Sequence, residues 1–255
     1  MDGKSYLPSR SLNMYAFGNN NRGLHMPATR IVAGRIDIVE PGEAPRPYER
    51  FVITLNPDGG RTLRTVTRSP AGDLLRDVNM MVDRDWRPVE GVGRLFLKGE
   101  LAGTVLRRVF PGRLDSYYWR PGEPMDHAVL EAPANMTLGF HPITGDAWKT
   151  NLMSTDHAEP QEVVVYTVSN TWFGGTLGHG HLLRSSAVYE GREDLELPVG
   201  VVPTERFLWT PRPGKELRIW RTGEARLLAR MEVVSGERPG SCYQLAAVEE
   251  ELVAE

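Results

Sequence analysis

Histidine and tyrosine side chains at strand-like spacing are the residues of this sequence best suited to proton transfer. His127 follows Met125 and precedes Val129 at intervals of two, which predicts that all three point the same way. Tyr118, in phase with Leu114 on the preceding expected strand, is predicted to approach His127 across the pair. In an apolar cavity they would form a general acid–base pair, because desolvation shifts the pKa of a buried group. The alternative is a core histidine with satisfied hydrogen bonds.

A second pair of histidines lies in a glycine-rich stretch. His179 and His181 are separated by one residue, so both imidazoles would share one face of a strand, as a metal site in a β-barrel requires. A third ligand would be His141 or a carboxylate. Two alternatives stay open: an acid–base role, together with Tyr166, or solvated imidazoles in a loop. The glycines at 174–180 would serve as a lid or as a plain hairpin loop.

Other side chains are candidates for holding a substrate. Arg107 would meet a ligand carboxylate or phenolate with two hydrogen bonds, or would pair with Asp115 or Asp77. Large aromatic residues flank the glycine-rich stretch and an irregular region before it. Their rings would line a pocket for a flat molecule, or they would belong to the core. The expected substrate contacts are Arg107, His141, Trp148 and Trp172.

Composition and missing motifs exclude several classes of function. No glycine-rich phosphate loop, paired-cysteine motif, His-Glu-x-x-His helix or Gly-x-Ser-x-Gly elbow is present, so no cofactor is expected. The 30 basic and 33 acidic residues are interspersed, which argues against a nucleic-acid partner. The first 20 residues hold no long apolar run, so we expect a cytoplasmic protein without a membrane partner. The single cysteine, Cys242, is expected to be a structural thiol.

The elements that must position these residues read as short strands. Alternating apolar and polar residues are separated by turn chemistry about every 8–12 residues, which is typical of an antiparallel β-protein. The clearest hairpin joins residues 51–55 to 62–67 through Asn-Pro-Asp-Gly-Gly at 56–60. Between residues 132 and 160 prolines and glycines interrupt the pattern, and residues 146–153 have room for two helical turns. We interpret this region as a crossover between two halves of one sheet.

The number of strands predicts how the sheet must be shaped. Eleven to thirteen strands in one chain must close or curl, because a flat sheet would leave edges and an uncovered apolar face. We therefore expect an all-β fold, with a single large antiparallel sheet curled into a half-barrel or lipocalin-like (calycin-like) barrel around a ligand cavity. A short helical crossover is expected near residues 140–155. Residues 1–255 would form one domain, with residues 1–29 as an extended N-terminal arm.

The C-terminal half resembles a known family. Its strands and turns resemble the closing strands of lipoprotein-carrier-like (LolA-like) half-barrels and related domains of unknown function. The segments that carry the resemblance are residues 188–208, 217–223, 227–232 and 243–245, within a span of 166–245. The resemblance implies an incomplete barrel of long antiparallel strands around an apolar cavity, with helical segments plugging its open side.

Three functional hypotheses follow from these observations. The first is a cofactor-independent lyase or isomerase that acts on a small aromatic or apolar compound through the candidate catalytic residues His127, Tyr118, Tyr166, His179 and His181. The second, suggested by the resemblance, is a carrier of an apolar ligand, with a cavity lined by Met80, Val82, Leu95, Leu97 and Ile219. The third is a metal-dependent enzyme that uses His179 and His181. Exposed edge strands also make a homodimer possible.

Overall fold

The fold is one large sheet, nearly closed into a barrel, in a computed structural model that describes residues 28–140, 142–168 and 178–253. The all-β class, the curled sheet and the helical crossover are therefore confirmed. Within the described residues the sheet has 15 strands, whereas the sequence predicts eleven to thirteen. Of the expected N-terminal arm, residues 1–27 lie outside the described residues, and Thr29 already begins the first strand.

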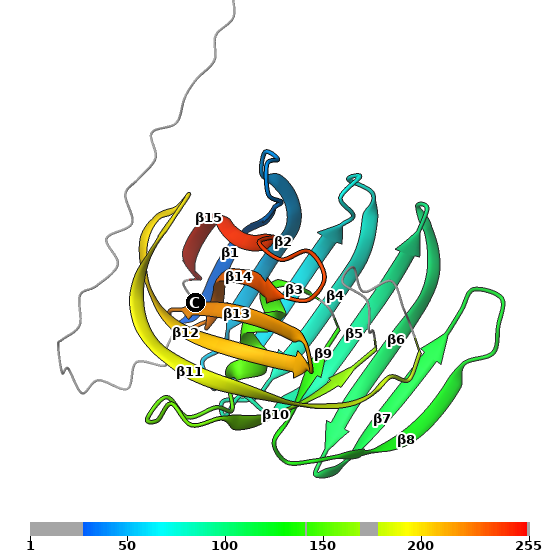
Figure 1. The fold of residues 1–255 in the computed structure, drawn as a ribbon. Helices are drawn as coiled ribbons and strands as arrows, with labels where there is room; N and C mark the ends of the chain where they lie inside the picture. The colour runs from blue at the N-terminus through cyan, green and yellow to red at the C-terminus, as the bar shows by residue number, and fades with distance from the viewer. Residues whose placement is uncertain (1–27, 141, 169–177, 254–255) are drawn as a thin grey trace, which may run out of the picture.

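The strands fall into two series along the chain, which form the two walls seen in Figure 1. The first series is β1 (Thr29–Val39), β2 (Arg46–Leu55), β3 (Arg61–Arg68), β4 (Leu74–Val82), β5 (Pro88–Leu97), β6 (Glu100–Phe110), β7 (Gly112–Trp119) and β8 (Asp126–Ala132). The second is β9 (Met136–Gly139), β10 (Gln161–Thr167), β11 (His181–Leu197), β12 (Gly200–Arg212), β13 (Lys215–Thr222), β14 (Leu227–Ser235) and β15 (Cys242–Val253). A 3-10 helix, η1 (Thr144–Thr150), separates β9 from β10.

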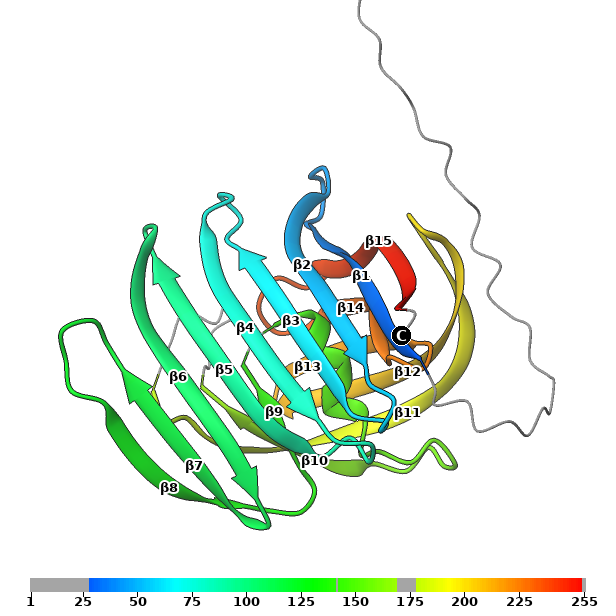
Figure 2. The same cartoon turned by 180° about the vertical axis from the view of Figure 1, so that it is seen from behind.

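The two series are joined by the first and last strands. Strands β1 to β8 pair antiparallel in chain order, as do β10 to β15, and β15 then pairs with β1. The predicted hairpin at 51–67 is confirmed, with Leu55 opposite Arg61. The crossover connects the two outer edges of the sheet, where β9 pairs parallel with β10. Seen from behind, the β1–β8 wall lies in front of η1 and the second series (Figure 2).

The short helix η1 lies inside the barrel, and all seven of its residues are buried. Glu49 of β2 anchors its start. The Glu49 carboxylate accepts hydrogen bonds from the backbone N–H of Ile143 (2.9 Å) and Thr144 (2.7 Å), and from the hydroxyls of Thr144 and Thr67 (2.7 Å each). These bonds satisfy helix-start N–H groups that have no partner within the helix. The buried glutamate therefore fixes η1 to the wall.

The sheet overlaps itself where β9 ends. The ring of Phe140, just after β9, lies directly on Gly91 and Gly93 of β5, so close that a Cβ at Gly91 would come within 2.1 Å of it. The β9 edge thus packs across β5 instead of pairing with β8. Strands β7 and β8 extend beyond this overlap, as Figure 1 shows. The concave face of β7 and β8 is therefore not covered by β9, and other residues can pack on it.

The cavity lining expected for a carrier is largely covered by the chain itself. Met80, Val82, Leu95 and Ile219 are buried in the core, but Leu97 is half exposed. Gly145 of η1 packs against Met80. The part of the interior next to Met80 is therefore occupied by η1.

Candidate functional site

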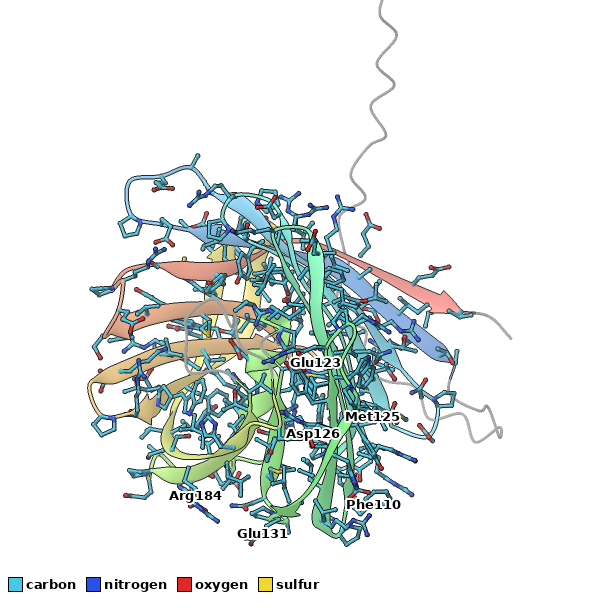
Figure 3. All side chains as sticks on the ribbon, turned by 90° about the vertical axis from the view of Figure 1, so that its right-hand side faces the viewer. Phe110, Glu123, Met125, Asp126, Glu131 and Arg184 are labelled. Atoms are coloured by element: carbon cyan, nitrogen blue, oxygen red, sulfur yellow. The ribbon has the colours of Figure 1, made fainter. Side chains whose placement is uncertain are left out.

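The ring of His179 is held on both nitrogens. Its Nδ1 lies 3.1 Å from the hydroxyl of Ser116 on β7, and its Nε2 lies 3.0 Å from the carboxylate of Asp126 on β8. Ser116 is fully buried, whereas the Asp126 side chain is largely exposed. The histidine thus connects the interior of the barrel with the solvent. Figure 3 shows Asp126 near the middle of this face, beside Met125 and below Glu123.

Arg107 of β6 lies directly opposite Ser116 in the ladder and is fully buried. Its Nη2 donates to the backbone carbonyl of His179 at 2.8 Å. The central carbon of its guanidinium lies 4.8 Å from the ring centroid of Phe140 and 4.4 Å from that of Tyr166. Among the described residues none accepts a hydrogen bond from Nε or Nη1. Burial lowers the pKa of Arg107 to about 10, so the group stays a cation at neutral pH.

Two tyrosines complete the group that we call the His179 site: Ser116, Tyr118, Asp126, His179, Arg107 and Tyr166. The Tyr166 hydroxyl donates to the carbonyl of His179, and burial raises its pKa while the charge of Arg107 opposes the rise. Tyr118 lies edge-on to the His179 ring at 6.3 Å, and its oxygen accepts a hydrogen bond from Arg120 Nε. The hydrogen bond from His179 holds the pKa of Asp126 below its usual 3.8.

The expected pairing of Tyr118 with His127 is wrong. The register places Tyr118 opposite Asp126, and His127 opposite Tyr117. His127 stacks on Tyr117 with ring centroids 4.4 Å apart, on the face of the sheet away from Ser116. His127 does share its side of the strand with Val129, as predicted, but that side is exposed. The cause is that β8 is an edge strand with apolar residues on both faces, so its alternation does not reveal which face is inside.

The other predicted residues are divided between the site and the rest of the molecule. Arg107, Tyr118, Tyr166 and His179 come together. His181 is an exposed residue opposite Thr167 at the start of β11. Trp148 of η1 is buried, donates its Nε1 hydrogen bond to the Ala225 carbonyl and packs edge-on against Trp86. Trp172, His141 and most of the 174–180 stretch lie outside the described residues.

The alternative partners of Arg107 bind other residues, and the metal hypothesis stays a prediction because its candidate third ligand, His141, lies outside the described residues. Asp115 is bound by Arg113, and Asp77 by Arg94. The described part of the chain contains no group of three or more His, Cys, Asp or Glu residues that could hold a metal ion. It also contains no helix long and apolar enough to cross a membrane.

Ser116 and Asp126 were not among the sequence candidates. They lie 63 and 53 positions from His179. Once β7 is paired with β8, Ser116 falls on the same face as Leu114 and Tyr118. A polar residue between two inward positions is the signal that would have singled it out.

Gly180 allows the close approach of the His179 segment to the sheet. Its φ is +79°, and an added Cβ would lie 2.3 Å from the Thr167 carbonyl and 2.8 Å from Arg107 Nη2. Gly178 also has a positive φ, of +143°, but no atom of the described residues lies within 4 Å of its added Cβ. We expect Gly180→Ala to lower the free energy of unfolding in urea by about 1–3 kcal/mol more than Gly178→Ala does. Equal losses would contradict this packing.

Comparison with known proteins supports the fold. No family model and no curated protein matches the sequence. A β-barrel-like protein of the DUF1849 family from Brucella abortus aligns with a TM-score of 0.51 and 9% identity, over 90% of this chain and all of that one. A DUF1089 family protein from Pseudomonas aeruginosa aligns with a TM-score of 0.46 and 11% identity, over 73% of this chain and 90% of that one. The chain therefore has a β-barrel-like fold similar to that of the Brucella protein.

Proposed function

We propose that the protein is a cofactor-independent enzyme of the lyase or isomerase type, which moves a proton on a small aromatic or apolar compound at the His179 site. The observation that carries this proposal is the His179 ring, fixed between Ser116 and Asp126 beside the cationic Arg107. A base oriented by a carboxylate, next to a buried cation, combines proton transfer with stabilisation of the resulting anion.

The proton path follows from the two partners of the ring. Asp126 accepts the N–H of Nε2, which leaves the lone pair of Nδ1 facing Ser116 and the concave side of the sheet. In the proposed step, the oxygen of Ser116 takes a proton from a C–H bond of the substrate while the Ser116 hydroxyl passes its own proton to Nδ1, and Asp126 stabilises the imidazolium that forms. Tyr118 keeps its O–H as a donor, because its oxygen accepts the hydrogen bond from Arg120.

Arg107 suits the anion that such a step produces. Removal of a proton beside a carbonyl leaves an enolate, whose oxygen would bind the Arg107 nitrogens Nε and Nη1. The rings of Phe140 and Tyr166 both lie against the guanidinium, so a flat substrate bound to Arg107 would have two aromatic rings beside it.

Deuterium incorporation tests this function without knowledge of the product. The purified protein is incubated in D₂O with small aromatic and aliphatic ketones and acids that carry a C–H next to a carbonyl, and exchange is followed by proton NMR. The proposal predicts catalysed loss of that C–H signal for at least one class of compound. Absence of exchange for every compound that binds would overturn the enzymatic role.

A carrier of an apolar ligand is the second candidate, favoured by the resemblance of residues 166–245 to lipoprotein-carrier-like half-barrels. Phe140 and Tyr166 would then form the apolar contacts, and Arg107 would serve to hold the ligand. Saturable binding of an apolar compound, observed without deuterium exchange in the same samples, would favour this candidate over the enzyme.

A further inference from the structure

Arg76 of β4 is a buried cation without a hydrogen-bond partner. Only 4% of its surface is exposed, and among the described residues none accepts a hydrogen bond from Nε, Nη1 or Nη2. The buried Arg221 differs, because it binds Glu205 and the carbonyl of Thr150. An unpaired buried guanidinium is costly, so its presence calls for a partner.

The nearest acidic residues of η1 and β2 are already engaged. Arg76 lies opposite Thr67 of β3, and Thr67 lies opposite Glu49. The Glu49 carboxylate holds the start of η1 through four hydrogen bonds, and Asp146 binds Lys149. The interior therefore carries a positive charge at Arg76 that no described hydrogen bond offsets.

Two tyrosines lie near this charge, and apolar residues flank it in the sheet. The rings of Tyr48 and Tyr243 lie 4.9 Å apart. Burial raises the pKa of both phenols, and the charge of Arg76 counteracts the rise. Leu95 lies opposite Arg76 on β5, and Val78 is the next inward residue of β4. The surroundings thus combine one cation with hydroxyls and aliphatic surface.

We propose that Arg76 is the anchor of a second binding site, which takes the carboxylate of a molecule with an apolar body. A carboxylate fits the planar guanidinium with two hydrogen bonds and supplies the missing countercharge. A monoanion matches the one charge of Arg76, and an apolar body matches its neighbours Leu95 and Val78. Met80 of β4 lies in the same cross-strand row of the sheet as Arg107 of β6. Arg76 lies four residues before Met80, which is about 13 Å along the strand. The Arg76 site is therefore distinct from the His179 site.

Decanoate and its neutral counterpart 1-decanol are suitable probes, and calorimetry and thermal unfolding measure their binding. We expect decanoate to raise the Tm of the wild type. Arg76→Met should weaken the binding of decanoate at least tenfold and should leave the binding of 1-decanol unchanged. Arg76→Met without ligand is expected to keep or raise the Tm, since it removes an unpaired charge. Arg94→Met removes an exposed arginine of the neighbouring strand β5 and is the control, which should retain decanoate affinity.

Several outcomes would overturn this site. Equal decanoate affinity in wild type and Arg76→Met, or no binding of decanoate to the wild type, would refute it. Loss of affinity in Arg107→Met alone would place the anion at the His179 site instead. Should Arg76→Met fail to fold, the Nε–H resonance of Arg76 in the wild type decides: it must shift when decanoate is added and stay in place with 1-decanol.

Discussion

Replacing Glu49 with alanine is expected to lower the free energy of unfolding by about 3–5 kcal/mol, because it removes the acceptor of a fully buried network. The backbone N–H groups of Ile143 and Thr144 and the hydroxyl of Thr67 would lose their partner inside the barrel. These bonds hold η1 against the β1–β8 wall, so the loss should affect the whole core. Equilibrium unfolding in urea measures it.

Two controls separate this network from an effect of charge alone. Glu49→Gln keeps the side-chain volume but presents an amide group to the N–H donors. Its free energy of unfolding should therefore fall by less than that of the alanine variant. Glu90→Ala removes a half-exposed glutamate 3.8 Å from Arg108, and should change stability by less than about 0.5 kcal/mol. A loss below about 1 kcal/mol for Glu49→Ala would contradict the anchoring role.

The pH dependence of the Glu49 effect has a definite sign. Burial raises the pKa of Glu49 above its usual 4.5, against the four hydrogen bonds that lower it. The stability that this group contributes is therefore complete below the unfolded pKa and is lost as the pH rises through the folded pKa. The deficit of Glu49→Ala should consequently be larger at pH 5 than at pH 8. A larger deficit at pH 8 would show that the ionised form stabilises the fold.

Replacing His179 with alanine is expected to reduce the proposed deuterium exchange by about 100- to 10,000-fold, the usual contribution of a positioned acid or base. The reason is that neither the Ser116 hydroxyl nor the Asp126 carboxylate can take the place of the imidazole as the proton acceptor. Initial exchange rates by NMR, compared with binding of the same compound, separate lost chemistry from lost affinity.

His127 provides the matched control for this variant. It is the same residue type on the neighbouring edge strand, but it stacks on Tyr117 on the opposite face of the sheet. His127→Ala should therefore catalyse deuterium exchange at the wild-type rate. The exchange rate of Asp126→Asn should lie between the rates of the two histidine variants. Equal losses for His127→Ala and His179→Ala would remove the basis for assigning the base.

The strands and turns of this protein were largely predictable from the sequence. Strand alternation and turn chemistry are local properties, so the hairpin through residues 56–60 and the class of the fold follow from neighbouring residues. The interruption between residues 132 and 160 likewise indicated the crossover in which η1 lies. A sheet of this many strands has to curl, because its apolar face must be covered.

The tertiary structure alone decided which side chains meet. The face of β8 on which a side chain lies depends on the register with β7, and this register places Asp126 on the face of Tyr118 and His127 on the opposite face. Ser116, Asp126 and His179 meet only because the tertiary structure brings His179, just before β11, against β7 and β8. The burial of Arg76 and Arg107 could not be predicted either. The alternation of a strand does not show whether a charged side chain contacts water, a carboxylate or a ligand. Local patterns determine strands, whereas long-range contacts determine the environment of each ionisable group.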